Sequence, residues 1–562
     1  MVKQVVPPET ERPPVEQPTS PNRVLLGALW VGAVWHVLWW SLPPAGINAL
    51  LGTGLAWLLW WFFLRGYGPL PVGTRALGML SILWAALPVW RSYPALTFFA
   101  WWAWLMTLFL ALPRYFPGDA WQATFWGWMR MVGAWLGALI PDVLRLLLLT
   151  ESRERFFIRY GRAIGLGLAL LLPLGLCFGG LLASADPIFE HYFVQLLSWN
   201  AWWEVLGRLL VIGLFAWLWL AGLLVAWHSR ETSRESTEGP SFEYLPWVSS
   251  AVVFGGLLLL FGFFLVLQAR YLFGGHVALQ TFDLTYAQYA RRGFGELVVV
   301  AVLFLGVLIT ADAFTARPNP RAEAVFRGFA WATLVAVSLM LASAAYRLGL
   351  YIQAFGLTST RLQVAVFMFW LLVALILAAW TVRRPKPHRW PLVILLPYFG
   401  FVLTLAVMNP ASWVVRVNVW RSRQGHELDI PYLIKEGELG PEVWVALEAV
   451  YRDPGALSER TRHELGAAIA CVAVFDEVRA SMTEDEASQS DVDWRGWSWG
   501  RWRGRAAYRR LVDDVRENFP VRVYEDRDSA GTWQRFQVRV NGDWRSCYDM
   551  SGIMDIYRYS ED

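Results

Sequence analysis

Charged residues are scarce in this chain. Asp, Glu, Lys and Arg make up only 17% of its 562 residues, against roughly 25% in a typical soluble protein, whereas hydrophobic residues make up 56%. A soluble fold could not bury that much apolar surface, so the composition excludes an ordinary soluble protein. The formal net charge of +4 is also small and lies largely in loops, which argues for lipid contact rather than nucleic-acid binding.

Motifs that carry chemistry are missing as well. The pairs His426-Glu427 and His463-Glu464 lack the second His of the zincin spacing. The glycines Gly165 and Gly167 lie within an apolar run, where small residues let helices approach each other. The sequence therefore predicts no metal site, no cofactor and no catalytic residue.

Cysteine is rare, with three residues in the chain. Cys177 lies in an apolar run and is expected to be a small buried side chain. Cys471 and Cys547 lie in the polar C-terminal region. They can pair only if that region meets an oxidising compartment, and the sequence leaves the pairing open.

What the chain does contain is a series of long apolar runs between Val24 and Met408. Each has roughly 17–23 residues, enough to cross a hydrocarbon core of about 30 Å as a helix. Many of the 36 Trp lie near the run ends, which suits the headgroup layer. About eleven spans are predicted, at residues 24–42, 47–64, 74–90, 95–112, 163–184, 205–227, 247–267, 294–316, 327–345, 362–382 and 390–408.

These runs predict an all-α polytopic membrane protein with a C-terminal polar α+β region. Residues 1–23 are rich in Pro, Glu and Thr and are expected to be disordered. Residues near 120–150 are apolar but interrupted by Arg and Asp, which favours helices lying in the interface. Residues 409–562 form the polar domain, mostly helical to about 515, followed by a small antiparallel sheet with an Asn541-Gly542 hairpin turn.

Lys and Arg predict the orientation of the chain. They concentrate in the N-terminal segment and in alternate loops, including the cluster from Arg153 to Arg162. The positive-inside rule then predicts a cytoplasmic N-terminus in the cell membrane. With an odd number of spans, the C-terminal domain is expected on the extracytoplasmic side.

Four groups of residues, in the same order along the chain, carry a family resemblance. They are SADPIF at 184–189, TYAQYARRGF at 285–294, YRLGLY at 346–351 with FGLT at 355–358 and Arg361, and NP at 409–410 with Arg416 and Asn418. Together they resemble a family of bacterial multi-pass membrane proteins described only as domain of unknown function 4173, related to the 4153 type. Phe355 and Val417 depart from the pattern. The resemblance covers roughly residues 24–450 and implies a membrane protein without an established activity.

The predicted topology brings these segments to one outer face. The candidate binding residues there are Asp186, Tyr286, Tyr289, Arg291, Arg292, Arg347, Tyr351, Arg361 and Arg416. Guanidinium groups beside Tyr suit a phosphate, a carboxylate or a glycan. The alternative is that these side chains pair with one another and only hold the loops together. For Asp186, which precedes Pro187, a helix-capping role is favoured over acid or base chemistry.

Two further features leave alternatives open. Asp312, near the inner end of a span, fits a proton relay or, preferably, an ion pair with a loop Arg. The basic aromatic run from Trp494 to Arg503 fits equally well lying on the membrane, binding an acidic polymer, or packing on the outer loops.

The sequence favours a non-enzymatic anchoring, sensing or assembly module at the outer membrane face. Its expected partners are the lipid bilayer and an anionic lipid or envelope polymer, and not nucleic acid. A transporter or lipid-handling permease is one alternative, although ionisable residues are sparse in mid-membrane. A membrane-embedded transferase acting on a phosphorylated or lipid-linked substrate is the other.

Overall fold

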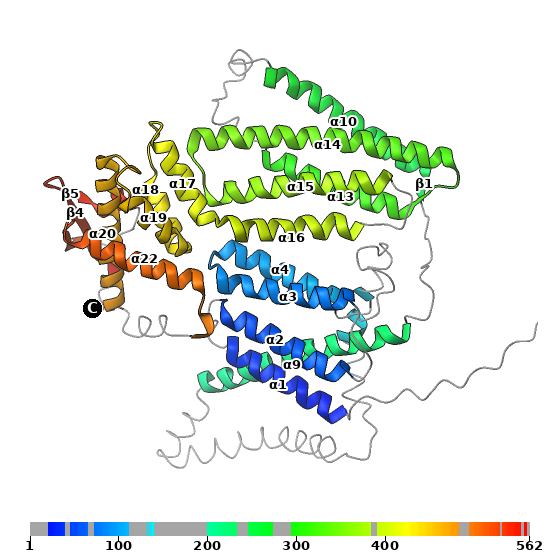
Figure 1. Cartoon of the computed structure of the whole chain (residues 1–562), viewed down its shortest axis with the longest axis horizontal. Helices are drawn as coiled ribbons and strands as arrows, with labels where there is room; N and C mark the ends of the chain where they lie inside the picture. The colour runs from blue at the N-terminus through cyan, green and yellow to red at the C-terminus, as the bar shows by residue number, and fades with distance from the viewer. Residues whose placement is uncertain are drawn as a thin grey trace, which may run out of the picture. The chain divides into compact units, whose positions relative to one another are not determined.

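The protein is mostly helical in its computed structural model (Figure 1). The structure describes residues 21–39, 45–65, 72–111, 132–133, 135–139, 199–232, 245–273, 294–383, 390–482, 494–528, 531–551 and 556–558. The predicted span at 163–184, most of the predicted interfacial segment near 120–150 and nearly all of the predicted disordered segment lie outside these residues. The chain divides into two compact units, which are described separately.

The first unit comprises residues 1–42, 54–70 and 132–231. Its long helices are α1 (Pro21–Trp39), most of α2 (Ile47–Leu64) and α9 (Trp199–Thr232). Aromatic rings join them, since Trp35 stacks on Phe215 at 4.9 Å and Trp60 on Trp219 at 6.3 Å. A Cβ atom on Gly32 would lie 2.2 Å from a backbone oxygen of α9. Helices α1 and α9 therefore approach closely at a glycine, a common way of packing membrane helices.

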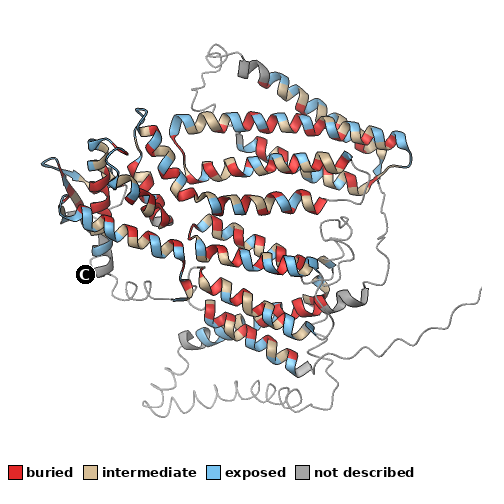
Figure 2. Cartoon of the chain, in the orientation of Figure 1, coloured by how far each residue is buried: buried red, intermediate tan, exposed pale blue. Residues whose placement is uncertain are grey.

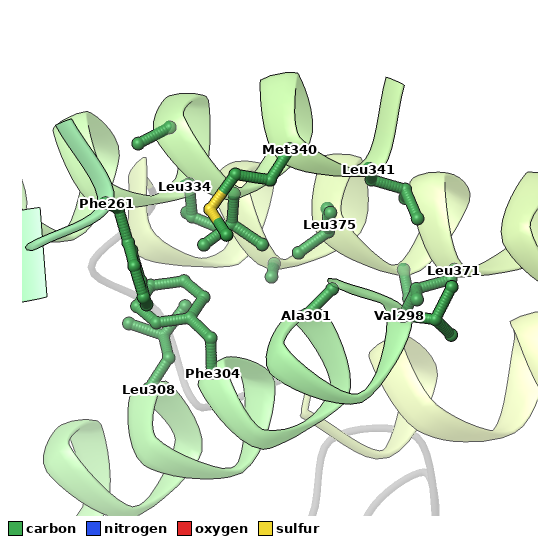
Figure 3. Close-up of a cluster of buried hydrophobic side chains, with 14 of the residues drawn as sticks. Phe261, Val298, Ala301, Phe304, Leu308, Leu334, Met340, Leu341, Leu371 and Leu375 are labelled. Carbon is green, nitrogen blue, oxygen red and sulfur yellow. The ribbon is translucent and has the colours of Figure 1, made fainter. Parts of the chain in front are cut away.

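The second unit holds the remaining apolar helices and the polar C-terminal domain. Its long apolar helices are α3 (Val72–Trp90), α4 (Pro94–Ala111), α10 (Trp247–Phe273), α13 (Phe294–Phe314), α14 (Pro320–Phe355), α15 (Ser359–Arg383) and α16 (Trp390–Met408). Side chains from α10, α13, α14 and α15 form a continuous core that includes Phe261, Phe304, Met340 and Leu375 (Figure 3).

Large apolar side chains also cover the outer faces of these helices. Leu259 is 77% exposed and Leu303 is 63% exposed, and exposed residues recur along α14 and along the described side chains of α10 (Figure 2). Water would not tolerate such faces over whole helices, whereas lipid tails do. Among the residues described, eight helices are long and apolar enough to cross a membrane, and two shorter apolar helices cover Arg23–Trp39 and Ile47–Phe63. The protein is therefore a multi-pass membrane protein, and the count of eleven spans stays a prediction.

Asp312 lies where α13 turns into α14, and it has partners there. Its Oδ1 atom is 2.9 Å from Arg317 Nη2, and Trp390 Nε1 donates to Oδ2 at 2.7 Å. Close by, the short strand β1 (Leu245–Pro246) pairs in parallel with β2 (Thr315–Ala316). Asp312 therefore forms the ion pair with a loop Arg that the sequence favoured over a proton relay. The hydrogen bond from Trp390 also links it to α16.

The C-terminal domain combines helices with a small sheet. The helices are α17 (Pro410–Ser422), α18 (Ile430–Leu439), α19 (Glu442–Arg452), α20 (Glu459–Met482), η4 (Trp494–Gly496), α22 (Trp499–Arg516) and α23 (Cys547–Ser551). Strands β3 (Val521–Asp528), β4 (Gly531–Val540) and β5 (Asp543–Ser546) form an antiparallel meander, and β6 (Ile556–Arg558) also pairs with β4. The turn between β4 and β5 is Asn541-Gly542, both with positive φ, as a type I′ hairpin requires. A disulfide between Cys471 and Cys547 joins α20 to α23.

Candidate functional site

The C-terminal helices of the second unit pack on the ends of its apolar helices. We call this region the docking interface: residues 45–47, 91–93, 356–359 and Asn409, together with the side chains of α17, α18, α19 and α22 that contact them. Hydrogen bonds and an ion pair link the two sides of this interface at several points.

The start of α2 forms the first contact. Ile47 donates its backbone N–H to the Trp497 carbonyl at 3.0 Å, and Arg501 donates to the Ala45 carbonyl at 2.8 Å. A Cβ atom on Gly46 would lie 2.3 Å from the Trp497 oxygen, so the two backbones touch. Burial lowers the pKa of Arg501 to about 10, and Arg505 contributes. The basic aromatic run from Trp494 to Arg503 thus contacts the start of α2 through the backbone of the run.

A buried carboxyl group from α19 forms the second contact. Glu442 is 4% exposed, and its carboxyl group lies 3.8 Å from Arg91 and beside the Ser92 backbone, which favours the charged form. With its amide turned to suit its neighbours, Asn409 donates to Glu442 at 3.1 Å and accepts from Arg91 at 3.1 Å. Burial raises the pKa of Glu442, and Arg91 opposes that rise. A Cβ atom on Gly500 would overlap this carboxylate, so α22 closes over it.

The start of α15 forms the third contact, with α18. Tyr432 accepts a hydrogen bond from the Ser359 backbone at 2.9 Å and donates its own proton to Glu436 at 2.7 Å. The Ser359 hydroxyl donates to the same carboxylate at 2.6 Å. Burial, and then the bond to Glu436, raise the pKa of Tyr432, which keeps the phenol protonated as a donor. Ser359 and Glu436 are buried and Tyr432 is half-buried, so water has little access to this triad.

Helix α17 crosses the corner between α14 and α15. The Asn418 side chain makes two hydrogen bonds with the Leu357 backbone, at 3.0 and 2.7 Å. Arg421 donates to the Gln353 carbonyl at 2.6 Å. Gly356 turns the corner with φ of 81°, and a Cβ atom there would meet both Arg421 and Asn418. A side chain is therefore excluded at Gly356 by both backbone conformation and space.

Two of the predicted site residues come together at this corner. The Arg361 guanidinium lies 4.0 Å from the centre of the Tyr351 ring and donates to the carbonyls of Phe355 and Gly356. It therefore satisfies the free carbonyls at the end of α14, where a cation is also favoured by the helix dipole. This contact is of the kind in which the predicted residues pair with one another and hold the loop between two helices. Arg347 is half-buried on α14, one turn before Tyr351.

Arg416 is exposed, whereas Arg347, Tyr351 and Arg361 are half-buried. It lies on α17 between the exposed Trp413 and Trp420, and these three side chains with Val417 line a hollow of about 170 Å³. The remaining predicted residues, Asp186, Tyr286, Tyr289, Arg291 and Arg292, lie outside the described residues.

Sequence reasoning missed the buried acids of the docking interface, Glu436 and Glu442. Each lies on a short helix whose start carries a visible signal, Asp429-Ile430-Pro431 for α18 and Pro441 for α19. Those signals predict the helices, but which face of each is buried depends on long-range packing. The useful hint was the apolar spacing around each Glu, which marks it as lying on a buried face.

Comparison with known proteins gives a family but no activity. A family model described as "Domain of unknown function (DUF4153)" matches residues 78–449. No curated protein and no solved structure matches the chain. The match includes Arg91, Ser359, Arg416, Glu436 and Glu442, and it ends within α19, before the disulfide and the sheet. The chain therefore belongs to the DUF4153 family of domains of unknown function, in agreement with the 4153-related resemblance of its sequence.

Proposed function

We propose that this protein is a non-enzymatic anchoring or sensing module, which holds its C-terminal domain against the ends of its membrane helices at the outer face of the cell membrane. The observation that carries the proposal is the docking interface. Three separate helix-end segments, at residues 45–47, 91–92 and 357–359, each contact the C-terminal domain, and the last of them bonds to both α17 and α18. A domain on a loose tether would need none of these buried contacts.

The rigidity of the interface supports anchoring. Glu436 and Glu442 are both at most 8% exposed; Glu436 accepts a hydrogen bond from Ser359, and Glu442 accepts one from the turned amide of Asn409. Removing one partner of such a group leaves a buried polar atom unsatisfied, which typically costs about 1–3 kcal/mol. The domain and the helix ends are therefore expected to move together, as a module that transmits a signal across the membrane requires.

Two observations support the outer side. Arg75, Arg317, Arg321 and Arg383 stand at helix ends away from the docking interface, as expected for a cytoplasmic side. The Cys471–Cys547 disulfide is also typical of an oxidising, extracytoplasmic compartment.

The aromatic run supports contact between the C-terminal domain and the membrane surface. While its backbone packs on residues 45–47, the side chains of Trp494, Trp497, Trp499 and Trp502 are 42–58% exposed. Indole rings favour the headgroup layer, where an apolar ring and a polar N–H are both satisfied. Of the alternatives that the sequence left open, packing on the loops and lying on the membrane are therefore compatible.

The variant Tyr432→Phe tests whether the interface anchors the domain. It removes one hydroxyl that links Ser359 to Glu436 and leaves the ring in place. We expect backbone amides near the start of α15 and in α18 to exchange about tenfold faster with solvent deuterium, because one buried hydrogen bond contributes roughly 1–1.5 kcal/mol.

Tyr548→Phe is the matched control, since Tyr548 is 55% exposed on α23. It is expected to leave exchange in the docking interface unchanged. If Tyr432→Phe also leaves exchange unchanged around Ser359, the triad does not hold the domain, and the anchoring function loses its main support.

A further inference from the structure

One face of α17 is open although the rest of the helix is packed. Val414, Val415 and Val419 are buried, whereas Trp413, Arg416 and Trp420 are exposed. The exposed residues follow each other at spacings of three and four, so they share one face of the helix. Together with Val417 they line the hollow of about 170 Å³.

The position of α17 decides what this face meets. The helix begins two residues after α16 ends and then crosses the ends of α15 and α14, as its bonds to Leu357 and Gln353 require (Figure 1). Another side of it contacts α19 of the C-terminal domain. With apolar helices on one side and the domain on the other, the open face points sideways at the level of the helix ends. In a membrane that level is the headgroup layer.

Arg416 has no assigned bonding partner among the residues that the structure describes: no hydrogen bond, ion pair or ring contact involves its guanidinium. The neighbouring arginines differ, because Arg361 and Arg421 both donate to backbone carbonyls and Arg91 bonds to the Ala406 carbonyl. The free guanidinium therefore offers its donors to a ligand from outside this part of the chain. A planar guanidinium matches a phosphate group, which it binds through two parallel N–H bonds.

We propose that the Trp413–Arg416–Trp420 face binds the phosphate of an anionic phospholipid headgroup. The proposal rests on the proposed function in one respect, the placement of α17 at the membrane surface. Arg416 pairs with the phosphate, and the two indoles pack beside the glycerol while their N–H groups stay in the polar layer. A membrane lipid is favoured over a soluble phosphate because the hollow is lined mainly by Trp and Val side chains.

The experiment measures lipid retention by the full-length protein. Detergent-solubilised protein is mixed with phosphatidylglycerol or phosphatidylcholine, and the bound lipid is counted by native mass spectrometry. We expect a preference for phosphatidylglycerol that falls about tenfold in Arg416→Gln, because a charged hydrogen bond is lost. Arg416→Lys is expected to retain part of the preference, since it keeps the charge but not the planar fork.

Arg460→Gln is the control, because Arg460 is an exposed arginine of α20 whose side chain is 86% accessible. It should bind lipid like the wild type. An unchanged preference in Arg416→Gln would overturn the proposal, as would displacement of the lipid by equimolar inorganic phosphate or soluble glycerol phosphate. Solubilised protein is used, so the result does not depend on the sidedness or the anchoring role, which the Tyr432→Phe variant tests separately.

Discussion

Replacing both Cys471 and Cys547 by Ala is expected to lower the free energy of unfolding of the C-terminal domain by about 2–4 kcal/mol. The disulfide closes a segment of 76 residues between α20 and α23, so it restricts the unfolded chain strongly. By loop entropy alone the loss would be about 4.5 kcal/mol at 25 °C for a loop of this length. Both sulfur atoms lie in buried residues, 1% and 2% exposed, and Ala avoids introducing an unsatisfied polar group there. Denaturant unfolding of the full-length protein in detergent, followed by deuterium exchange in α20, measures the change.

Cys177→Ala is the control for this pair, because it removes the remaining thiol of the chain without touching the disulfide. Its unfolding midpoint is expected to match the wild type. Reductant should shift the wild-type midpoint toward that of the double variant and leave the double variant unchanged. A wild-type midpoint that is insensitive to reductant would contradict a structural disulfide in this domain.

Gly504→Ala is expected to destabilise the packing of α19 on α22 by about 1–3 kcal/mol, the usual cost of overpacking. A Cβ atom at Gly504 would lie 2.1 Å from the Pro441 carbonyl oxygen, and Pro441 directly precedes α19. Backbone atoms cannot swing aside as a flexible side chain can, so the two helices must separate. Because Glu442 follows Pro441, the separation also disturbs the docking interface. Deuterium exchange in α19 and residues 91–93 reports both effects.

Gly328→Ala on α14 provides the matched control. Gly328 is an exposed helical glycine, and a Cβ atom added to it would meet no other atom within 4 Å. Ala at this position should therefore be neutral or stabilise the helix by up to about 1 kcal/mol. Gly→Ala is thus expected to lower the stability at position 504 and to preserve or raise it at position 328. If both variants unfold at the same denaturant concentration, α19 and α22 do not pack as closely as described.

The membrane character and the individual helices follow from local patterns, and for that reason they could be predicted. Apolar runs of membrane-spanning length match α3, α4, α10 and α13 to α16, because one helix is decided by its own composition and length. The Asn541-Gly542 turn is also local, since two residues set its backbone geometry. The family-like order of short strings agrees with the matched family.

The candidate site could be predicted only in part, because its contacts are long-range. Sequence reasoning singled out Arg361 and Tyr351, which do meet, but gave no sign that Arg361 binds the carbonyls at the end of its own hairpin. It missed Glu442, whose partners Arg91 and Ser92 lie some 350 residues earlier in the chain. Spacing along one helix carries no information about such partners. Arg416 was singled out for its charge, but the two indoles beside it became relevant only once α17 had a buried and an open face.

The central claim is that the C-terminal domain is docked on the side of the membrane opposite the cytoplasm. Two probes that each add one thiol to a Cys177→Ala background, with the Cys471–Cys547 disulfide kept, test it most directly: Arg460→Cys at the exposed start of α20, and Arg321→Cys in the first turn of α14. Both are treated with a membrane-impermeant maleimide in intact cells and again after permeabilisation. We predict labelling of Arg460→Cys in intact cells and of Arg321→Cys only after permeabilisation. The reverse pattern, or the same pattern for both probes, would contradict the claim.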